Sequence, residues 1–178
     1  MGGWQAAAEA GLELRQVPRF DERADQLWDA VAPVLGFSVR RDTAYLNWKF
    51  ADHHYHAYVL WLAERAGELR GYIVLRREDI EGLTYGYRVD LLTDPNEPEP
   101  AMFLVRSALM HFHVLGVDLV KVLFSWDAYS RVLSALRFIR TSASPGFLVF
   151  ANDTALITRL RNPAEWHVTK GDSDLGAV

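Results

Sequence analysis

The stretch "DLLTDPNEPEPAMFLVRSALMHF" (Asp90–Phe112) combines a strand, a short loop and a helix, and the rest of the fold is built around this unit. Its loop contains three prolines and two glutamates but no glycine. Many α/β proteins bind a phosphate group at such a junction through glycines and free backbone N–H groups. Proline and acidic residues are instead good helix starters. The stretch therefore predicts a stable helix start rather than a conventional phosphate site.

Segments on both sides of this unit alternate between strand and helix patterns. The expected strands are Leu12–Val17, Ala57–Ala63, Leu69–Arg76, Leu83–Leu92, Leu119–Phe124 (buried on both faces), Phe147–Ala151 and Trp166–Thr169. The expected helices are one between Asp21 and Gly36, then Arg41–Phe50, Ala101–Leu115 and Asp127–Arg140, while Leu156–Arg161 fits a strand or a short helix. The order β-α-α-β-β-β-α-β-α-β-β, with turn residues between three consecutive strands, predicts an α/β fold around one mixed, largely antiparallel sheet.

Composition narrows the class of protein. A length of 178 residues suits one domain. A net charge of −4 without a basic stripe argues against a nucleic-acid partner. The absence of cysteine excludes disulfides, thiolate metal sites and cysteine nucleophiles. The sequence has no apolar run of the roughly 18 residues that a membrane span needs, and its start does not resemble a signal peptide. We expect a cytoplasmic protein or domain without membrane insertion.

Four segments and the element order resemble the GCN5-related N-acetyltransferase (GNAT) superfamily. The segments are "VRRDTAYLNWKF" (Val39–Phe50), "GYIVLRR" (Gly71–Arg77), "VDLLTD" (Val89–Asp94) and "EWHVTKGDSD" (Glu165–Asp174). They resemble the C-terminal half of tandem GNAT proteins linked to polysaccharide or cell-envelope metabolism. The resemblance implies a GNAT-like domain over residues 12–170, between an extension (1–11) and a solvated tail (171–178). It also implies a possible sister domain or homodimer.

The resemblance implies acyl transfer from acetyl-CoA, or another acyl-pantetheine donor, to an amine of a small molecule or sugar. In such folds the fourth strand pairs with the pantetheine arm and the next helix start takes the pyrophosphate. The matching positions are Leu91, Leu92 and Thr93 on the strand, and Ala101 and Met102 on the helix. The missing glycine loop is easier to reconcile with a pantetheine arm on a carrier protein, because that donor lacks the nucleotide pyrophosphate.

The same resemblance suggests two catalytic candidates. Asp90 on the fourth strand is the candidate base, provided that burial raises its pKa, and pairing with Arg88 or a backbone N–H is its alternative role. Tyr129 is the candidate acid for the leaving thiolate, because the position that aligns with the family tyrosine is Leu133, one helical turn later. Core packing is the alternative for Tyr129.

No metal site is expected. His54 and His56 share a strand face but lack a third ligand other than Asp52, and Asp172 and Asp174 fit a solvated tail better than a cation site. The missing phosphate loop and the displaced tyrosine also support a second function: a catalytically degenerate GNAT-like domain that serves as a binding, interaction or dimerisation module.

Overall fold

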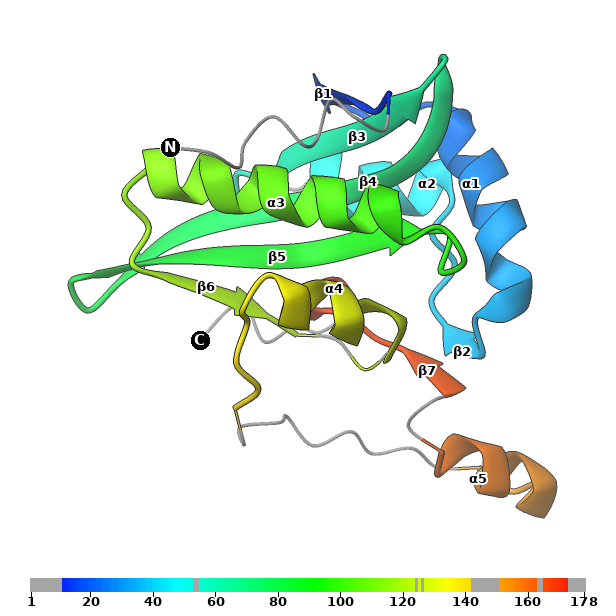
Figure 1. Ribbon diagram of the computed structural model, residues 1–178. Coiled ribbons are helices and arrows are strands. Elements are labelled where there is room, and N and C mark those ends of the chain that lie inside the picture. Colours follow the sequence, from blue (N-terminus) through cyan, green and yellow to red (C-terminus); the bar gives the residue numbers. More distant parts are fainter. Residues whose placement is uncertain are drawn as a thin grey trace.

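The computed structural model describes residues 11–52, 55–123, 125, 127–141, 151–162 and 165–172. Its centre is a five-stranded sheet in the order β1-β3-β4-β5-β6 (Figure 1). The strands are β1 (Glu13–Val17), β3 (Val59–Arg65), β4 (Glu68–Ile80), β5 (Leu83–Thr93) and β6 (Leu119–Val122). All neighbours are antiparallel except β5 and β6, which are parallel. The predicted mixed, largely antiparallel α/β sheet is confirmed.

The two faces of the sheet carry separate apolar cores. Helix α3 (Pro98–Val114) covers one face, and α1 (Arg23–Val31) and α2 (Thr43–Leu46) cover the other (Figure 1). Helix α3 buries Ala101, Leu104, Val105, Ala108 and Phe112, which lie along one helical stripe. Gly86 of β5 permits this contact, because a Cβ there would lie 2.9 Å from the Phe112 ring.

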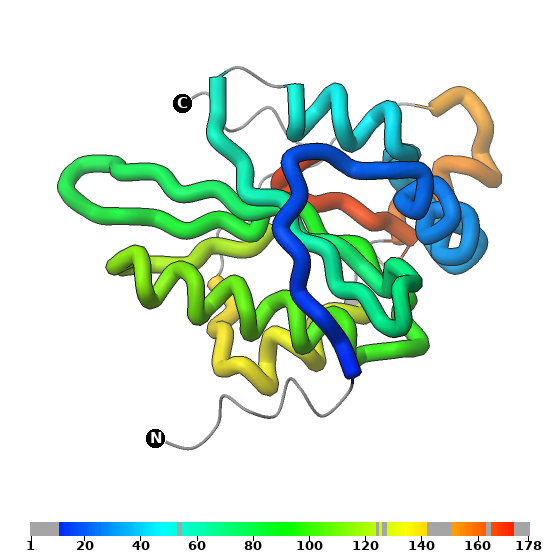
Figure 2. The backbone as a smooth tube through the Cα atoms, turned by 90° about the horizontal axis from the view of Figure 1, so that it is seen from above, coloured from blue at the N-terminus to red at the C-terminus, as the bar shows by residue number. Residues whose placement is uncertain are grey.

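The β4–β5 hairpin is longer than expected and extends past the rest of the molecule (Figure 2). Strand β4 pairs from Gly71 opposite Thr93 down to Ile80 opposite Leu83. The register shifts between Val74 and Leu75, which places a bulge in the facing strand next to Asp90. A bulge bends a strand and re-aims its side chains, so the second half of β5 points in a different direction from the first.

The two N-terminal helices differ in their caps, because Glu22 at the start of α1 makes no side-chain cap hydrogen bond. Asp42 caps α2 by accepting a hydrogen bond from the Tyr45 backbone N–H at 2.8 Å. The chain then continues as a π-helical turn, η3 (Asn47–Ala51). A 3₁₀ turn, η2 (Ala32–Val34), ends the first helical segment before Gly36.

Several expectations in the second half of the chain are corrected. Strand β6 is not buried on both faces: it is an edge of the described sheet, and Leu119 is 48% exposed. The expected helix 127–140 is a 3₁₀ turn, η4 (Asp127–Tyr129), followed by α4 (Ser130–Ala135). It ends early because Arg137 adopts a left-handed conformation with φ of 64°. Residues 156–160 belong to a helix, α5 (Thr154–Leu160), and Arg161 is its C-cap.

The C-terminal strand lies outside the main sheet. β7 (Trp166–His167) pairs in parallel with β2 (Phe37–Ser38), a strand that the sequence pattern did not indicate. A final 3₁₀ turn, η6 (Lys170–Asp172), follows. The strand expected over 147–151 lies almost entirely outside the described residues, and Ala151 itself is not in a strand.

Candidate functional site

Strand β6 pairs with only the first part of the longer strand β5. They pair only from Tyr85 opposite Leu119 to Arg88 opposite Val122. Beyond this point the chain turns towards β7, where the Ser125 backbone N–H donates to the Val168 carbonyl at 3.0 Å. Among the described residues, no strand therefore pairs with the Leu91–Thr93 edge of β5 on its β6 side. We call this unpaired Leu91–Thr93 edge of β5 the wedge.

The Tyr129 hydroxyl occupies the place of a pairing strand in the wedge. It accepts a hydrogen bond from the Thr93 backbone N–H at 3.1 Å and donates to the Leu91 carbonyl at 3.4 Å. Tyr129 is only 2% exposed, and burial raises the pKa of its phenol. The Thr93 side-chain hydroxyl is also buried here, without a hydrogen-bond partner among the described residues.

Two further titratable groups surround Tyr129. The Arg88 guanidinium lies 5.7 Å from the centre of the Tyr129 ring and donates to the Leu123 carbonyl at 3.1 Å. Burial lowers the pKa of Arg88 to about 10, so it remains a cation at neutral pH. The His167 ring lies 6.3 Å from that of Tyr129. Burial lowers the pKa of His167 to about 3, so its ring is neutral.

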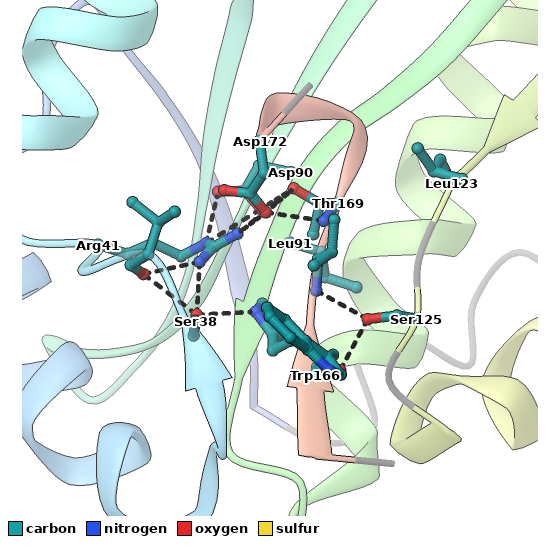
Figure 3. A network of polar contacts seen from close by, with 12 residues as sticks. Ser38, Arg41, Asp90, Leu91, Leu123, Ser125, Trp166, Thr169 and Asp172 are labelled. Carbon is teal, nitrogen blue, oxygen red and sulfur yellow. Dashed lines mark hydrogen bonds and ion pairs between the residues drawn. The ribbon is translucent and has the colours of Figure 1, made fainter. Parts of the chain in front are cut away.

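Asp90 lies on the opposite side of β5 and is enclosed by donors (Figure 3). Its carboxylate accepts from Arg41 Nε at 3.1 Å, from the Tyr72 hydroxyl at 2.9 Å and from the Thr169 hydroxyl at 2.9 Å. Burial alone would raise its pKa, but Arg41 and the other partners hold the pKa of Asp90 below its ordinary value. A general base needs a raised pKa and access to the amine. The geometry therefore argues against the predicted base role and favours a structural one.

Arg41 joins three distant parts of the chain in this network. Its guanidinium also donates to Asp172 Oδ2 at 2.5 Å, to the Ser38 hydroxyl at 2.7 Å and to the Val39 carbonyl at 2.8 Å (Figure 3). Asp172 was expected in a solvated tail, yet its side chain is only 7% exposed. Burial raises the pKa of Asp172, although Arg41 acts in the opposite direction. The network thus fixes the η6 turn against β5.

The sequence pattern did not indicate Arg41, His167 or Thr169 as members of this cluster. Arg41 and Thr169 lie within the segments that carry the family resemblance, "VRRDTAYLNWKF" and "EWHVTKGDSD". The membership of Arg41 and Thr169 in these two segments was the signal that the sequence offered. Their burial could not be read from spacing, because their partners are far away in the sequence.

The predicted cofactor positions are divided between the two cores. Leu91 packs in the core under α3, whereas Leu92 belongs to the opposite core. Ala101 is buried and Met102 is partly buried on α3. The structure brings Leu91 and Thr93 to Tyr129 but leaves the side chain of Leu92 on the far face.

The start of α3 differs from an anion site. Glu97 precedes the helix, no side chain caps it, and Pro98 and Pro100 remove N–H donors from its first turn. The Glu97 carboxylate lies 3.8 Å from Arg65. The acidic side chains of Glu97 and Glu99 would repel a pyrophosphate, as the sequence indicated.

The histidine-rich segment gives no metal site among the residues that the structure describes. Asp52 forms an ion pair with Arg19, and the His56 ring packs edge-on against Tyr58. His54 lies outside the described residues, as does Asp174. Within the described ranges, no helix combines the length and apolar character required to cross a bilayer.

No protein-family model and no curated protein matches the chain. Solved structures do match. A ribosomal-protein-alanine N-acetyltransferase from Brucella melitensis biovar Abortus 2308 superposes with a TM-score of 0.59 at 15% identity, covering 79% of this chain and 99% of that one. Glucosamine-6-phosphate N-acetyltransferase from Arabidopsis thaliana superposes with a TM-score of 0.54 at 11% identity, covering 77% of this chain and 97% of that one.

A third match is an aminoglycoside acetyltransferase from an uncultured soil metagenomic sample, solved in complex with sisomicin. It gives a TM-score of 0.52 at 16% identity, covering 82% of this chain and 97% of that one. At these identities the matches show a shared fold. Together with the sheet order and the separation of β5 from β6, they establish that this chain has the fold of the GCN5-related N-acetyltransferases.

Proposed function

We propose that the chain is an N-acyltransferase domain that takes an acyl group from a pantetheine thioester and transfers it to an amine of a small molecule or sugar. The observation that carries the proposal is the pairing of the Leu91 carbonyl and the Thr93 N–H with a side-chain hydroxyl rather than with a strand. An amide group of a pantetheine arm offers both a donor and an acceptor. It can replace the Tyr129 hydroxyl at both backbone groups.

Tyr129 then has two roles. While no donor is bound, its hydroxyl forms hydrogen bonds with the Leu91 carbonyl and the Thr93 N–H. Once the arm has displaced this hydroxyl, it provides a proton. In the reaction the amine nitrogen attacks the thioester carbonyl carbon, the C–S bond breaks and the thiolate takes a proton from the phenol. The raised pKa of Tyr129 keeps this phenol protonated at neutral pH. The nitrogen that becomes the amide releases one proton, and this proton restores the Tyr129 phenolate to the phenol through solvent, so protons and charge balance.

The surroundings of the wedge support a buried polar ligand. The Thr93 hydroxyl is a buried group without a partner among the described residues, and such groups often indicate a missing ligand or water. The Arg88 cation lies next to Tyr129, where it would stabilise negative charge on a thiolate or a tetrahedral oxygen.

The start of α3 limits the choice of donor. The family resemblance implies that a nucleotide pyrophosphate binds at the helix start that contains Glu97 and Glu99, so free acetyl-CoA should bind more weakly than a donor without the nucleotide. Such a donor is a pantetheine arm on a carrier protein. The predicted cofactor positions Leu91 and Thr93 would contribute backbone groups, and Ala101 and Met102 would border the arm.

A non-catalytic interaction module is the second candidate. It is favoured by the enclosure of the Asp90 carboxylate, which is 1% exposed and accepts hydrogen bonds from three side chains. A domain of this kind would keep the fold and its buried polar network without binding a thioester.

Calorimetric titration with acetyl-pantetheine and with acetyl-CoA separates the two candidates. The proposal predicts that acetyl-pantetheine binds the wild type, and binds the Tyr129→Phe variant more tightly because the competing hydroxyl is gone. The variant should transfer the acyl group more slowly. Tyr55→Phe is the control, because Tyr55 is 88% exposed. Absence of acetyl-pantetheine binding in both the wild type and Tyr129→Phe would support the non-catalytic module instead.

A further inference from the structure

The chain leaves the edge of β5 directly after β6. The four residue pairs between these two strands keep one register, and its continuation would place Ser125 opposite Leu91. Ser125 is instead bonded to the stretch that begins with β7. Backbone N–H and C=O groups need hydrogen-bond partners when they are removed from water. The chain after β6 therefore has two competing partners, the wedge and β7, and in this structure it takes β7.

Ser125 makes three hydrogen bonds with this stretch (Figure 3). Its backbone N–H donates to the Val168 carbonyl at 3.0 Å. Its hydroxyl donates to the Trp166 carbonyl at 2.7 Å and accepts from the Val168 N–H at 2.8 Å. The hydroxyl thus acts as donor and acceptor at once, and it supplies two of the three bonds that hold Ser125 beside β7.

The stretch to which Ser125 is bonded is anchored at both ends. We call this stretch, Trp166–Asp172, the strap. Its first two residues form β7, which pairs in parallel with β2. Near its other end, the Thr169 hydroxyl donates to the Asp90 carboxylate at 2.9 Å, and Asp172 accepts from the buried Arg41. The strap is therefore a fixed support rather than a second loose segment.

Arg88 provides a second contact that holds the chain after β6 in this position. Its guanidinium donates to the Leu123 carbonyl at 3.1 Å, so a side chain of β5 and not its backbone satisfies this group. Together, the contacts of Leu123 and Ser125 direct the chain away from the wedge. The backbone groups of the wedge then face the Tyr129 hydroxyl.

We propose that Ser125 is a positioning residue for acyl transfer: its hydroxyl fastens the chain after β6 to the strap and so keeps the wedge accessible to a pantetheine arm. This inference rests on the proposed function. Ser125 acts through the position of the chain and not through contact with the donor. Without the hydroxyl, one backbone bond to Val168 remains, and pairing of the chain with the wedge becomes competitive. The apparent dissociation constant then rises in inverse proportion to the fraction of molecules with an accessible wedge.

Calorimetric titration of the full chain with acetyl-pantetheine tests this role. Ser125→Ala loses two hydrogen bonds and should raise the dissociation constant on the order of tenfold. In transfer assays it should raise KM for the donor by a similar factor and leave kcat unchanged, because Ser125 takes no part in the chemical step. Ser125→Thr keeps the hydroxyl and should restore binding. Ser134→Ala, at an exposed position of α4, is the matched control.

Hydrogen exchange at the Val168 amide measures the contact itself. Exchange should be faster in Ser125→Ala, because the hydroxyl that accepts this hydrogen bond is gone. Ser125→Cys has a similar size but a weaker donor and acceptor, and it should give intermediate exchange and intermediate binding. The same comparison can be made with Ser125→Cys alone if Ser125→Ala does not fold.

The possible results separate this inference from the proposed function. Absence of acetyl-pantetheine binding by both the wild type and Tyr129→Phe overturns both. Binding by the wild type that Ser125→Ala and Ser125→Cys leave unchanged overturns the role of Ser125 alone. A lower kcat with an unchanged KM in these variants would also overturn it, because a positioning role at the wedge affects donor binding.

Discussion

The Asp90 carboxylate is held by donors from three separate segments: Arg41 before α2, Tyr72 on β4 and Thr169 before η6. Each donor is itself buried, and Arg41 is balanced by a second carboxylate, that of Asp172. Buried ion pairs contribute little net stability against an apolar alternative, but loss of one partner leaves the other charge uncompensated. The network therefore determines where η6 lies, and its integrity matters more than the strength of any one pair.

Replacement of Asp90 by Asn should destabilise the protein by up to about 3–5 kcal/mol, because Arg41 loses one of its two buried carboxylate partners. Urea denaturation measures this change. Asp79→Asn, in the exposed pair with Arg77, is the control and should cost less than about 1 kcal/mol. An Asp90→Asn variant with wild-type stability and abolished acyl transfer would restore the base role that the sequence suggested.

His167 makes stability depend on pH. Its folded-state pKa is lowered to about 3, whereas an unfolded histidine titrates near 6.5. The unfolded state therefore binds the extra proton first as the pH falls. The contribution of His167 to stability is complete above pH 6.5 and is lost as the pH falls from 6.5 towards 3.

His167→Gln should remove this pH dependence, which amounts to on the order of 4 kcal/mol between pH 6.5 and 3. Urea midpoints measured at several pH values test it, with the exposed His113→Gln of α3 as the control. If the unfolding free energy of His167→Gln depends on pH as it does in the wild type, then folded and unfolded His167 bind this proton equally well.

At the scale of elements, α3 and the β3–β4–β5 meander could be predicted because their apolar patterns are long and regular. Strand β2 could not, because two residues carry no periodicity. Strand β7 lies within the expected strand Trp166–Thr169, but its pairing with β2 depends on contacts between Phe37 and Trp166, which are far apart in the sequence. The early end of α4 at Ala135 depends on the left-handed conformation of Arg137, which its residue type does not suggest. In contrast, the prolines and glutamates at the start of α3 indicated directly that this helix start does not favour an anion.

The packing of α3 on β5 should depend on the absence of a side chain at position 86. Gly86→Ala should destabilise the protein by about 1–3 kcal/mol, because the added Cβ would lie 2.9 Å from the Phe112 ring. Thermal or urea denaturation of Gly86→Ala, Phe112→Leu and the double variant forms the test. The smaller leucine side chain of Phe112→Leu should relieve part of the cost of Gly86→Ala, so strictly additive effects would contradict this contact.

The start of α3 should determine whether the nucleotide part of acetyl-CoA is accepted. Replacement of Glu97–Pro100 by four glycines frees backbone N–H donors and removes two negative charges. We expect tighter acetyl-CoA binding, unchanged acetyl-pantetheine binding and a loss of up to about 1 kcal/mol for each glycine within the helix. Calorimetric titration with both donors tests this, and acetyl-CoA binding that is already as tight in the wild type would contradict it.

At the scale of the whole molecule, the two faces of the sheet carry different polar groups. Tyr129 and Arg88 lie beside the unpaired Thr93 edge of β5, where we propose that the acyl donor binds. The Arg41–Asp90–Asp172 network lies on the opposite side of β5, with Tyr72, and ties η6 to this strand.

The central claim is that a pantetheine arm replaces the Tyr129 hydroxyl at the Thr93 backbone N–H. Titration of ¹⁵N-labelled protein with acetyl-pantetheine, followed at the Thr93 amide signal, tests this most directly. We expect a saturable change at Thr93 and at neighbouring β5 residues, reached at a lower ligand concentration in Tyr129→Phe. If the Thr93 signal stays unchanged in both proteins, even at acetyl-pantetheine concentrations that saturate every other binding event, then the arm does not replace the Tyr129 hydroxyl at this N–H.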